Sequence, residues 1–231
     1  QELQWAPAKD RGALIMSIPG LLNRATDRKL AAQITERALG DWLADAEVGA
    51  QAWTVIAQMK AQNQDMEGAF QAVQRGAALN PKRAEPIWLG MELARTMPVA
   101  KVWVTQSLSN FDDPVLHQGW ARILVEMGQL REAENAMLLR VQKNPKEISA
   151  WLVLGAVQQE LKNNRGASEA WQRYLKETEG QAPRKREREQ ALLGLAQIAI
   201  DEKNDKQADH WLAQIGDGEN AMRALGLRAS I

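Results

Sequence analysis

The chain has 231 residues, enough for one large domain or two small ones, and its 29 Lys and Arg residues balance 29 Asp and Glu residues. Zero net charge argues against a general nucleic-acid binder and against a polybasic membrane-surface protein, because both need a basic face to attract phosphate groups. The absence of cysteine excludes disulfides, thiolate nucleophiles and Cys-ligated metal sites. No apolar run is long enough to span a bilayer. Because the chain begins at Gln1 and shows no signal peptide, we expect a processed fragment of a longer chain.

The composition predicts an all-α protein. Ala, Leu, Gln, Glu, Arg and Lys dominate, and these are good helix formers. Thr and Ile are scarce, and no stretch alternates apolar and polar residues for long enough to form a half-buried strand. The aromatic residues are unusual, with nine Trp against two Phe and one Tyr.

Periodic apolar residues predict a single array of imperfect helical pairs along the chain. In chain order the pairs occupy about residues 11–49, 50–82, 83–113, 114–147, 148–181 and 189–222, and a terminal helix occupies 220–231. The first pair is expected to split near Ala25-Thr26-Asp27. The pair 83–113 is shorter than the others, so we expect a shortened turn or helix there.

A repeated motif underlies this division. The pair 148–181 has Trp151 before Leu154-Gly155 and Ala167 before Trp171, which are the spacings W-x2-L-G and A-x3-W. The corresponding residues of three other pairs are Trp53, Ile56-Ala57, Ala69 and Val73; His117, Trp120-Ala121, Ala133 and Met137; and Leu192, Leu195-Ala196, Ala208 and Leu212. Pro81 and Pro145 end two second helices, because proline lacks the N–H that a helix needs.

This pattern, with its period of about 34 residues, resembles the tetratricopeptide repeat (TPR) family. The resemblance implies helix-turn-helix units stacked into a right-handed α-solenoid with a concave groove. The small residues Ala69, Ala133 and Ala167 are then expected to allow the two helices of each unit to approach closely.

Local strings are similar to one bacterial subgroup, the proteobacterial outer-membrane TPR lipoproteins. The strings are Trp120-Ala121-Arg122-Ile123-Leu124-Val125-Glu126 with Leu130-Arg131-Glu132-Ala133, and Leu212-Ala213-Gln214-Ile215-Gly216-Asp217-Gly218. The resemblance covers about residues 112–231 and is weaker before them. It implies a periplasmic adaptor that binds and activates a carboxyl-terminal processing protease.

Residues able to carry out catalysis are few. His117 occupies the slot of a packing Trp and His210 lies on a second helix, and neither has a matching base, acid or metal ligand. Asp112 and Asp113 precede Pro114, where we expect them to cap a helix. The sequence therefore predicts no catalytic residue, no cofactor, no metal site and no enzyme activity.

Two other sets of residues leave alternatives open. The basic run Arg184 to Arg188 is interrupted by Glu187, which favours a solvated helix face over an anion-binding patch. Most Trp residues occupy packing positions of the repeat. Less well placed, and so candidates for a binding surface, are Trp5, Trp42, Trp88 and Trp103.

The resemblance to TPR proteins places the binding residues on the concave face of the first helices. The predicted residues are Gln51, Thr54, Gln58, Gln118, Arg122, Leu152, Gln159 and Gln197. TPR proteins that clamp an acidic carboxyl-terminal peptide use Lys and Asn at such places, whereas here Arg122 is the one cation. A wall of Gln, Ala and Leu suits an extended segment or a helix. Arg122 could bind a partner carboxylate or carbonyl oxygens, or pair with Glu126.

We therefore expect a non-enzymatic scaffold that binds a protein partner in its groove, with no nucleic-acid partner and no membrane insertion by this part of the chain. The subgroup resemblance implies a location in the periplasm, outer-membrane anchoring of the full-length protein and a protease partner; a cytoplasmic location is the alternative. The other hypothesis is a TPR substrate-recognition or regulatory region of a larger enzyme whose catalytic domain lies elsewhere.

Overall fold

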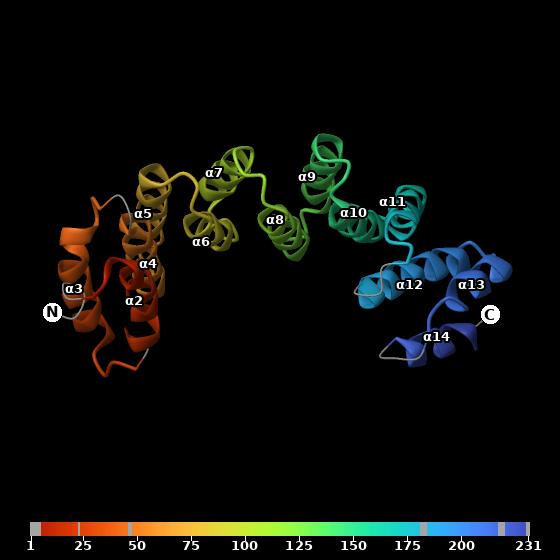
Figure 1. Ribbon diagram of the computed structural model, residues 1–231, viewed down its shortest axis with the longest axis horizontal. Helices are drawn as coiled ribbons and strands as arrows, with labels where there is room; N and C mark the ends of the chain where they lie inside the picture. The colour runs from red at the N-terminus through yellow and green to blue at the C-terminus, as the bar shows by residue number, and fades with distance from the viewer. Residues whose placement is uncertain (1–5, 23, 46–47, 181–183, 217–219, 230–231) are drawn as a thin grey trace. The chain divides into compact units, whose positions relative to one another are not determined.

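The computed structural model describes residues 6–22, 24–45, 48–180, 184–216 and 220–229, and helices account for 77% of it. These ranges contain thirteen α-helices and no strand, which confirms the predicted all-α class. The chain divides into two compact units, Gln1–Asp112 (unit 1) and Asp113–Ile231 (unit 2), and each is described by itself (Figure 1). No helix in the described ranges is both long and apolar enough to cross a bilayer.

Unit 1 is a series of packed helical pairs. Its elements are α2 (Ala8–Leu22), α3 (Arg28–Leu39), the 3-10 turn η1 (Gly40–Trp42), α4 (Gly49–Gln62), α5 (Met66–Leu79), α6 (Glu85–Leu93) and α7 (Pro98–Leu108). Helix α4 packs along α5, α6 packs along α7, and α2 lies against α4. Helix α6 has nine residues where α4 has 14, and α7 has 11 where α5 has 14, so both helices of the short pair are shortened.

Unit 2 repeats the same arrangement more regularly. Its elements are α8 (Pro114–Glu126), α9 (Leu130–Lys143), α10 (Ile148–Glu160), α11 (Asn164–Glu177), α12 (Lys185–Asp201), α13 (Asp205–Leu212) and α14 (Ala221–Arg228). Each first helix packs along the second helix of its pair, and α9 and α11 also pack on the first helix of the following pair (Figure 1). Helix α14 buries Ala224 in a cluster with Leu193 of α12 and Leu212 of α13.

Side-chain caps and prolines fix where many of these helices begin. A cap side chain accepts a hydrogen bond from a backbone N–H of the first turn, which satisfies a donor that the helix itself leaves unpaired. The caps of this kind are Asp27, Asp65, Asp113, Asn163 and Asn204. Asp113 accepts from the Val115 N–H at 2.8 Å, and Pro114 follows it at a position that needs no donor, which confirms the predicted capping role of Asp113.

The turns inside four pairs share one backbone conformation. The residue just before the second helix's N-cap has a left-handed φ, of 65° at Gln64, 73° at Gly128, 59° at Lys162 and 57° at Lys203. These four residues occupy the same position of the repeated motif. This turn conformation therefore recurs at the same position as the sequence motif does.

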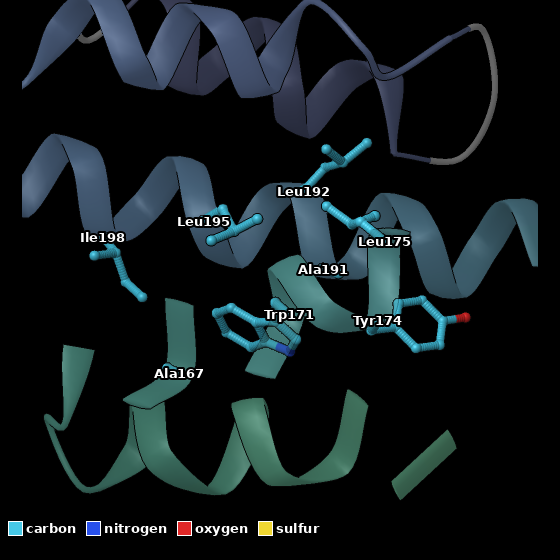
Figure 2. Close-up of a cluster of buried hydrophobic side chains, with 8 residues drawn as sticks. All are labelled: Ala167, Trp171, Tyr174, Leu175, Ala191, Leu192, Leu195 and Ile198. Carbon is cyan, nitrogen blue, oxygen red and sulfur yellow. The ribbon is translucent and has the colours of Figure 1, made fainter. Parts of the chain in front are cut away.

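Small residues allow the paired helices to approach each other, as the pattern predicts. The repeat alanines Ala69, Ala133 and Ala167 are fully buried, at 0% exposure. Trp171 of α11 lies between α10 and α12, and Figure 2 shows it in one cluster with apolar side chains of α12. A Cβ atom added at either Gly155 or Gly194 would overlap the indole ring of Trp171. The indole thus fills a space that exists because both neighbours are glycine.

Candidate functional site

A hydrogen bond connects the face of α8 that carries predicted binding residues to α10. Val115, Gln118 and Arg122 are spaced i, i+3, i+7, so they lie along one face of α8. The Gln118 Nε2 atom donates to Ser149 Oγ on α10 at 2.8 Å, which joins this face to the corresponding face of α10. We call the joined surface the first-helix face; its residues are Val115, Gln118, Arg122, Ser149, Leu152, Ala156 and Gln159.

Arg122 is the charged residue of the first-helix face, and it is accessible. Its side chain is 73% exposed, and its Nε atom lies 3.9 Å from Glu126 Oε1, one helical turn away. The ion pair considered from the sequence is therefore present. At this exposure and distance such a pair contributes about 0.3–0.5 kcal/mol, so Arg122 can exchange Glu126 for a partner at little cost.

The other predicted residues of unit 2 differ in accessibility. Leu152 is half-buried, because it packs against the apolar cluster of α11 and α12. Gln159 is also half-buried on α10. Gln197 lies on α12, where its Nε2 atom donates to Asp201 Oδ1 at 2.9 Å. Because this hydrogen bond stays within α12, it does not join Gln197 to another helix as the bond of Gln118 does, and Gln197 does not belong to the first-helix face.

In unit 1 the structure corrects the prediction for two residues. Gln51 is 5% exposed and Thr54 is 2% exposed, so neither is available to a partner. The reason is that α2 lies against this part of α4: a Cβ at Gly12 of α2 would be 3.1 Å from Gln51 Nε2. Thr54 uses its hydroxyl within α4, where it donates to the Ala50 carbonyl at 2.8 Å. Gln58, one turn further on, is half-buried.

The two histidines considered for catalysis lie in different environments. His117 is half-buried in its repeat slot, and His210 is exposed with its ring 4.9 Å from that of Trp211. Within the described ranges no three His, Asp or Glu residues are grouped as metal ligands would be. Trp42, Trp88 and Trp103 are half-buried, whereas Trp5 lies outside the described residues.

The basic run is partly structural. Lys185, Arg186 and Glu187 are exposed, as a solvated face requires. Arg188 is half-buried, because its Nη1 atom donates to the Leu175 carbonyl at 2.6 Å and to Thr178 Oγ1 at 2.7 Å. Arg188 therefore caps the carboxyl-terminal end of α11, where a cation also meets the negative end of the helix dipole.

A buried carboxylate joins three helices of unit 2. Glu134 of α9 is 7% exposed, and its Oε1 atom accepts from Gln158 Nε2 at 3.1 Å and from Asn163 Nδ2 at 3.3 Å. Its Oε2 atom accepts from Arg131 Nη1 at 3.1 Å. Burial by itself would raise the pKa of Glu134, but the hydrogen bonds from Gln158, Arg131 and Asn163 outweigh it and hold the pKa below its usual value.

Two pockets lie away from the predicted residues. One, in unit 2, has a volume of about 430 Å³ and is lined by Gly180, Lys185, Arg188, Glu189, Leu192 and Gln214, among others. The other, in unit 1, has a volume of about 340 Å³ and lies between α3 and α4. Neither pocket was predicted from the sequence. For the pocket of unit 2, the sequence does show that Leu192 stands where two other repeats have Trp.

The paired helices define an all-α fold of tetratricopeptide-type helix-turn-helix repeats. Two solved structures of similar length have the same fold. YrrB, described as a TPR protein with an unusual peptide-binding site, matches with a TM-score of 0.54 and 15% identity, over 86% of this chain and 99% of its own. PilW, described as a widely conserved type IV pilus biogenesis factor, matches with a TM-score of 0.55 and 17% identity, over 94% and 98%.

Yeast Tom70 also contains this fold. It matches with a TM-score of 0.52 and 16% identity, over 94% of this chain and 46% of its own. No family profile matches the sequence, and no curated protein matches it as a sequence relative. At these identities the likeness shows the TPR fold alone, and it agrees with the fold predicted from the repeated motif.

Proposed function

We propose that this protein is a non-catalytic adaptor that binds a segment of a partner protein on the first-helix face of unit 2. The observation that carries the proposal is the 2.8 Å hydrogen bond from Gln118 to Ser149, because it joins the predicted residues of two successive repeats into one surface. A segment several residues long needs a surface that crosses more than one helix.

The chemistry of the first-helix face suits a polypeptide backbone. Gln118, Ser149 and Gln159 carry side-chain donors and acceptors, and Arg122 adds a planar set of N–H donors for carboxylates or carbonyl oxygens. Val115, 64% exposed, and Leu152 supply modest apolar contact. The peptide-binding site named for YrrB, a TPR protein of the same fold, supports this choice of ligand.

The more specific form of the proposal concerns location and partner. The strings at 120–133 and 212–218, which resemble outer-membrane TPR lipoproteins, support a periplasmic adaptor for a carboxyl-terminal processing protease. The test is to mix the purified chain with such a protease and measure both binding and the rate of substrate cleavage. Absence of binding would reject the protease as partner and leave the first-helix face to be tested with other proteins.

The face itself is tested by two matched charge reversals. Arg122→Glu changes the first-helix face, whereas Arg165→Glu changes a second helix; both arginines are exposed and paired with a Glu four residues on, at 3.9 and 3.0 Å. Both variants place two acids one turn apart, so their effects on helix stability should match. Arg122→Glu should weaken partner binding at least fivefold, as expected for an interface residue worth about 1 kcal/mol.

Photo-crosslinking provides the same comparison when the partner is unidentified. A photoreactive residue at position 118 or 122 should give a crosslinked product with a discrete partner, whereas one at the exposed Leu139 of α9 should not. Equal crosslinking from both helices, or unchanged affinity in Arg122→Glu, would contradict the proposed surface.

A further inference from the structure

Two repeats hold a tryptophan in the same way. Trp53 lies 5.0 Å beneath the guanidinium of Arg75, and Trp151 lies 5.8 Å beneath that of Arg173. In both pairs the arginine follows the tryptophan at the same interval along the sequence. Each indole N–H donates to a carbonyl before its own helix, at 3.0 Å to Leu43 and at 3.2 Å to Pro145. We call this arrangement the tryptophan slot.

The last full repeat, residues 189–222, lacks both the tryptophan and the arginine of the slot. The positions that correspond to Trp151 and Arg173 are Leu192 and Gln214, displaced along the chain by the same interval. That interval also separates the left-handed turn residues Lys162 and Lys203, so the backbone supports this alignment. The Gln214 amide is turned back along α13, where it donates to the His210 carbonyl at 3.2 Å.

The 430 Å³ pocket of unit 2 lies at this vacated slot. Leu192 and Gln214 both line it, and so does Gly180, which lies three residues after the end of α11. An aliphatic side chain and an amide thus stand where two other repeats have an indole and a guanidinium, and among the described residues a pocket lies beside them.

The pocket also contains a buried carboxylate with an unused acceptor. Glu189 is 6% exposed, and its Oε2 atom accepts from Asn220 Nδ2 at 2.9 Å. Its Oε1 atom is buried and forms an ion pair with the Lys185 ammonium at 3.8 Å, but it accepts no hydrogen bond from any described residue. The ion pair compensates the charge, yet a buried acceptor without a hydrogen-bond donor is costly, so this atom favours a ligand that brings an N–H group.

We propose that this pocket binds a tryptophan side chain of a partner protein, which takes the place of the indole that the repeat lacks. The indole plane lies against Leu192, its N–H donates to Glu189 Oε1, and the cations of Lys185 and Arg188 lie beside the ring. The proposal rests on the proposed function, because it supplies an anchoring site for the same kind of partner.

The charges around the pocket select a neutral ring over a charged group. A partner lysine would meet Lys185 and Arg188, whereas a partner carboxylate would meet Glu189 in a buried setting. An indole carries an N–H donor without a net charge, so it pairs with the carboxylate and accepts the cations at its π face. Phenylalanine would fill the space but leave Glu189 Oε1 without a donor.

The experiment titrates residues 1–231 with a fluorinated N-acetyl-tryptophanamide and follows 19F NMR line width. Saturable binding is expected, with at least threefold weaker binding of the phenylalanine analogue and no binding of N-acetyl-lysinamide. Gln214→Arg restores the arginine of the slot and should tighten tryptophan binding about two- to fivefold, the effect of one exposed cation–π contact.

A second variant fills the slot from within. Leu192→Trp should raise the melting temperature and abolish probe binding, whereas Met222→Trp, at a position 77% exposed, should change neither. Absence of saturable binding, equal binding of the lysine probe, or unchanged affinity in both Leu192→Trp and Gln214→Arg would overturn the proposal. Because the probe is a free amino-acid derivative, these outcomes leave the test of the first-helix face with Arg122→Glu unaffected.

Discussion

Two glycines, Gly155 and Gly194, provide the space in which the Trp171 indole packs. The indole is 2% exposed and lies between α10 and α12, where Gly155 and Gly194 provide the space for its ring. A methyl group at either glycine would overlap the ring, and helices on both sides prevent the ring from moving away. The W-x2-L-G motif therefore has a physical reason in this repeat: its glycine accommodates an aromatic side chain from the paired helix.

We predict that Gly155→Ala and Gly194→Ala destabilise the protein. Overpacking a close contact costs about 1–3 kcal/mol, which exceeds the gain of about 0.5–1 kcal/mol from placing alanine in a helix. The control is Gly226→Ala in α14, where an added Cβ atom would meet nothing within 4 Å. This variant should be more stable than the parent protein. Urea unfolding measures all three. Equal stabilisation of the three variants would show that Trp171 is not confined as described.

We predict that Glu134 makes the stability of unit 2 dependent on pH. Its pKa is lowered in the folded state, so its contribution is complete above the pKa of the unfolded chain and is lost as pH falls through the folded pKa. Glu134→Gln should cost roughly 1–2 kcal/mol at pH 7, and the difference from the parent should shrink below about pH 4. Urea unfolding at several pH values measures this. The control, Glu160→Gln at an exposed position, should show no such trend.

Sequence reasoning identified the packing residues better than the binding residues. The repeat pattern located Ala167 and Trp171 because their burial follows from contacts within one helical pair. The burial of Gln51 and Thr54 depends instead on α2, a helix of a degenerate pair whose position on α4 no motif specifies. The repeat pattern aligned Leu192 with Trp53 and Trp151, but it did not report the pocket that Leu192 and Gln214 line.

At the scale of elements, the turns between paired helices contain backbone strain. Gln64, Lys162 and Lys203 have left-handed φ values, which cost an ordinary L-residue roughly 1 kcal/mol each, whereas Gly128 has the same conformation without that cost. The turn leads directly into the capping residue of the second helix. The same tight turn is therefore maintained in these four pairs even where the sequence does not supply glycine.

We predict that Lys203→Gly stabilises the protein by about 0.5–1 kcal/mol, because glycine adopts the left-handed conformation freely. The matched control is Gln172→Gly at an exposed position inside α11, which should destabilise by about 1 kcal/mol. Chemical unfolding should show that the free energy of unfolding rises in Lys203→Gly and falls in Gln172→Gly. A loss of stability in both would indicate that the turn does not require the left-handed conformation.

At the scale of the whole molecule, the repeat pattern predicted the fold class but not the division into two units. The TPR fold follows from spacings within about 34 residues, and these are local properties of the sequence. The division falls between Asp112 and Asp113, and in sequence this point looks like any other junction between repeats. Compactness depends on contacts between helices, which the spacing of a motif does not report.

We therefore predict that residues 113–231 fold by themselves. The apolar clusters around Trp171, around Met137 and Leu154, and around Leu193 and Leu212 lie entirely within these residues. Three helical pairs with a terminal helix also meet the number of repeats that a stable array needs. The isolated unit should give a helical far-UV circular dichroism spectrum and a single cooperative transition in urea.

The first residue of the isolated unit provides an internal test of this boundary. Asp113 caps α8 through its 2.8 Å bond to the Val115 N–H, so a unit that begins at Pro114 loses the cap. The loss of an Asp cap costs about 1 kcal/mol, and the shorter unit should unfold at a correspondingly lower urea concentration. A gradual, non-cooperative transition in both would show that unit 2 needs unit 1 to fold. Equal midpoints would show instead that α8 frays at its start and that the cap contributes nothing to the unit's stability.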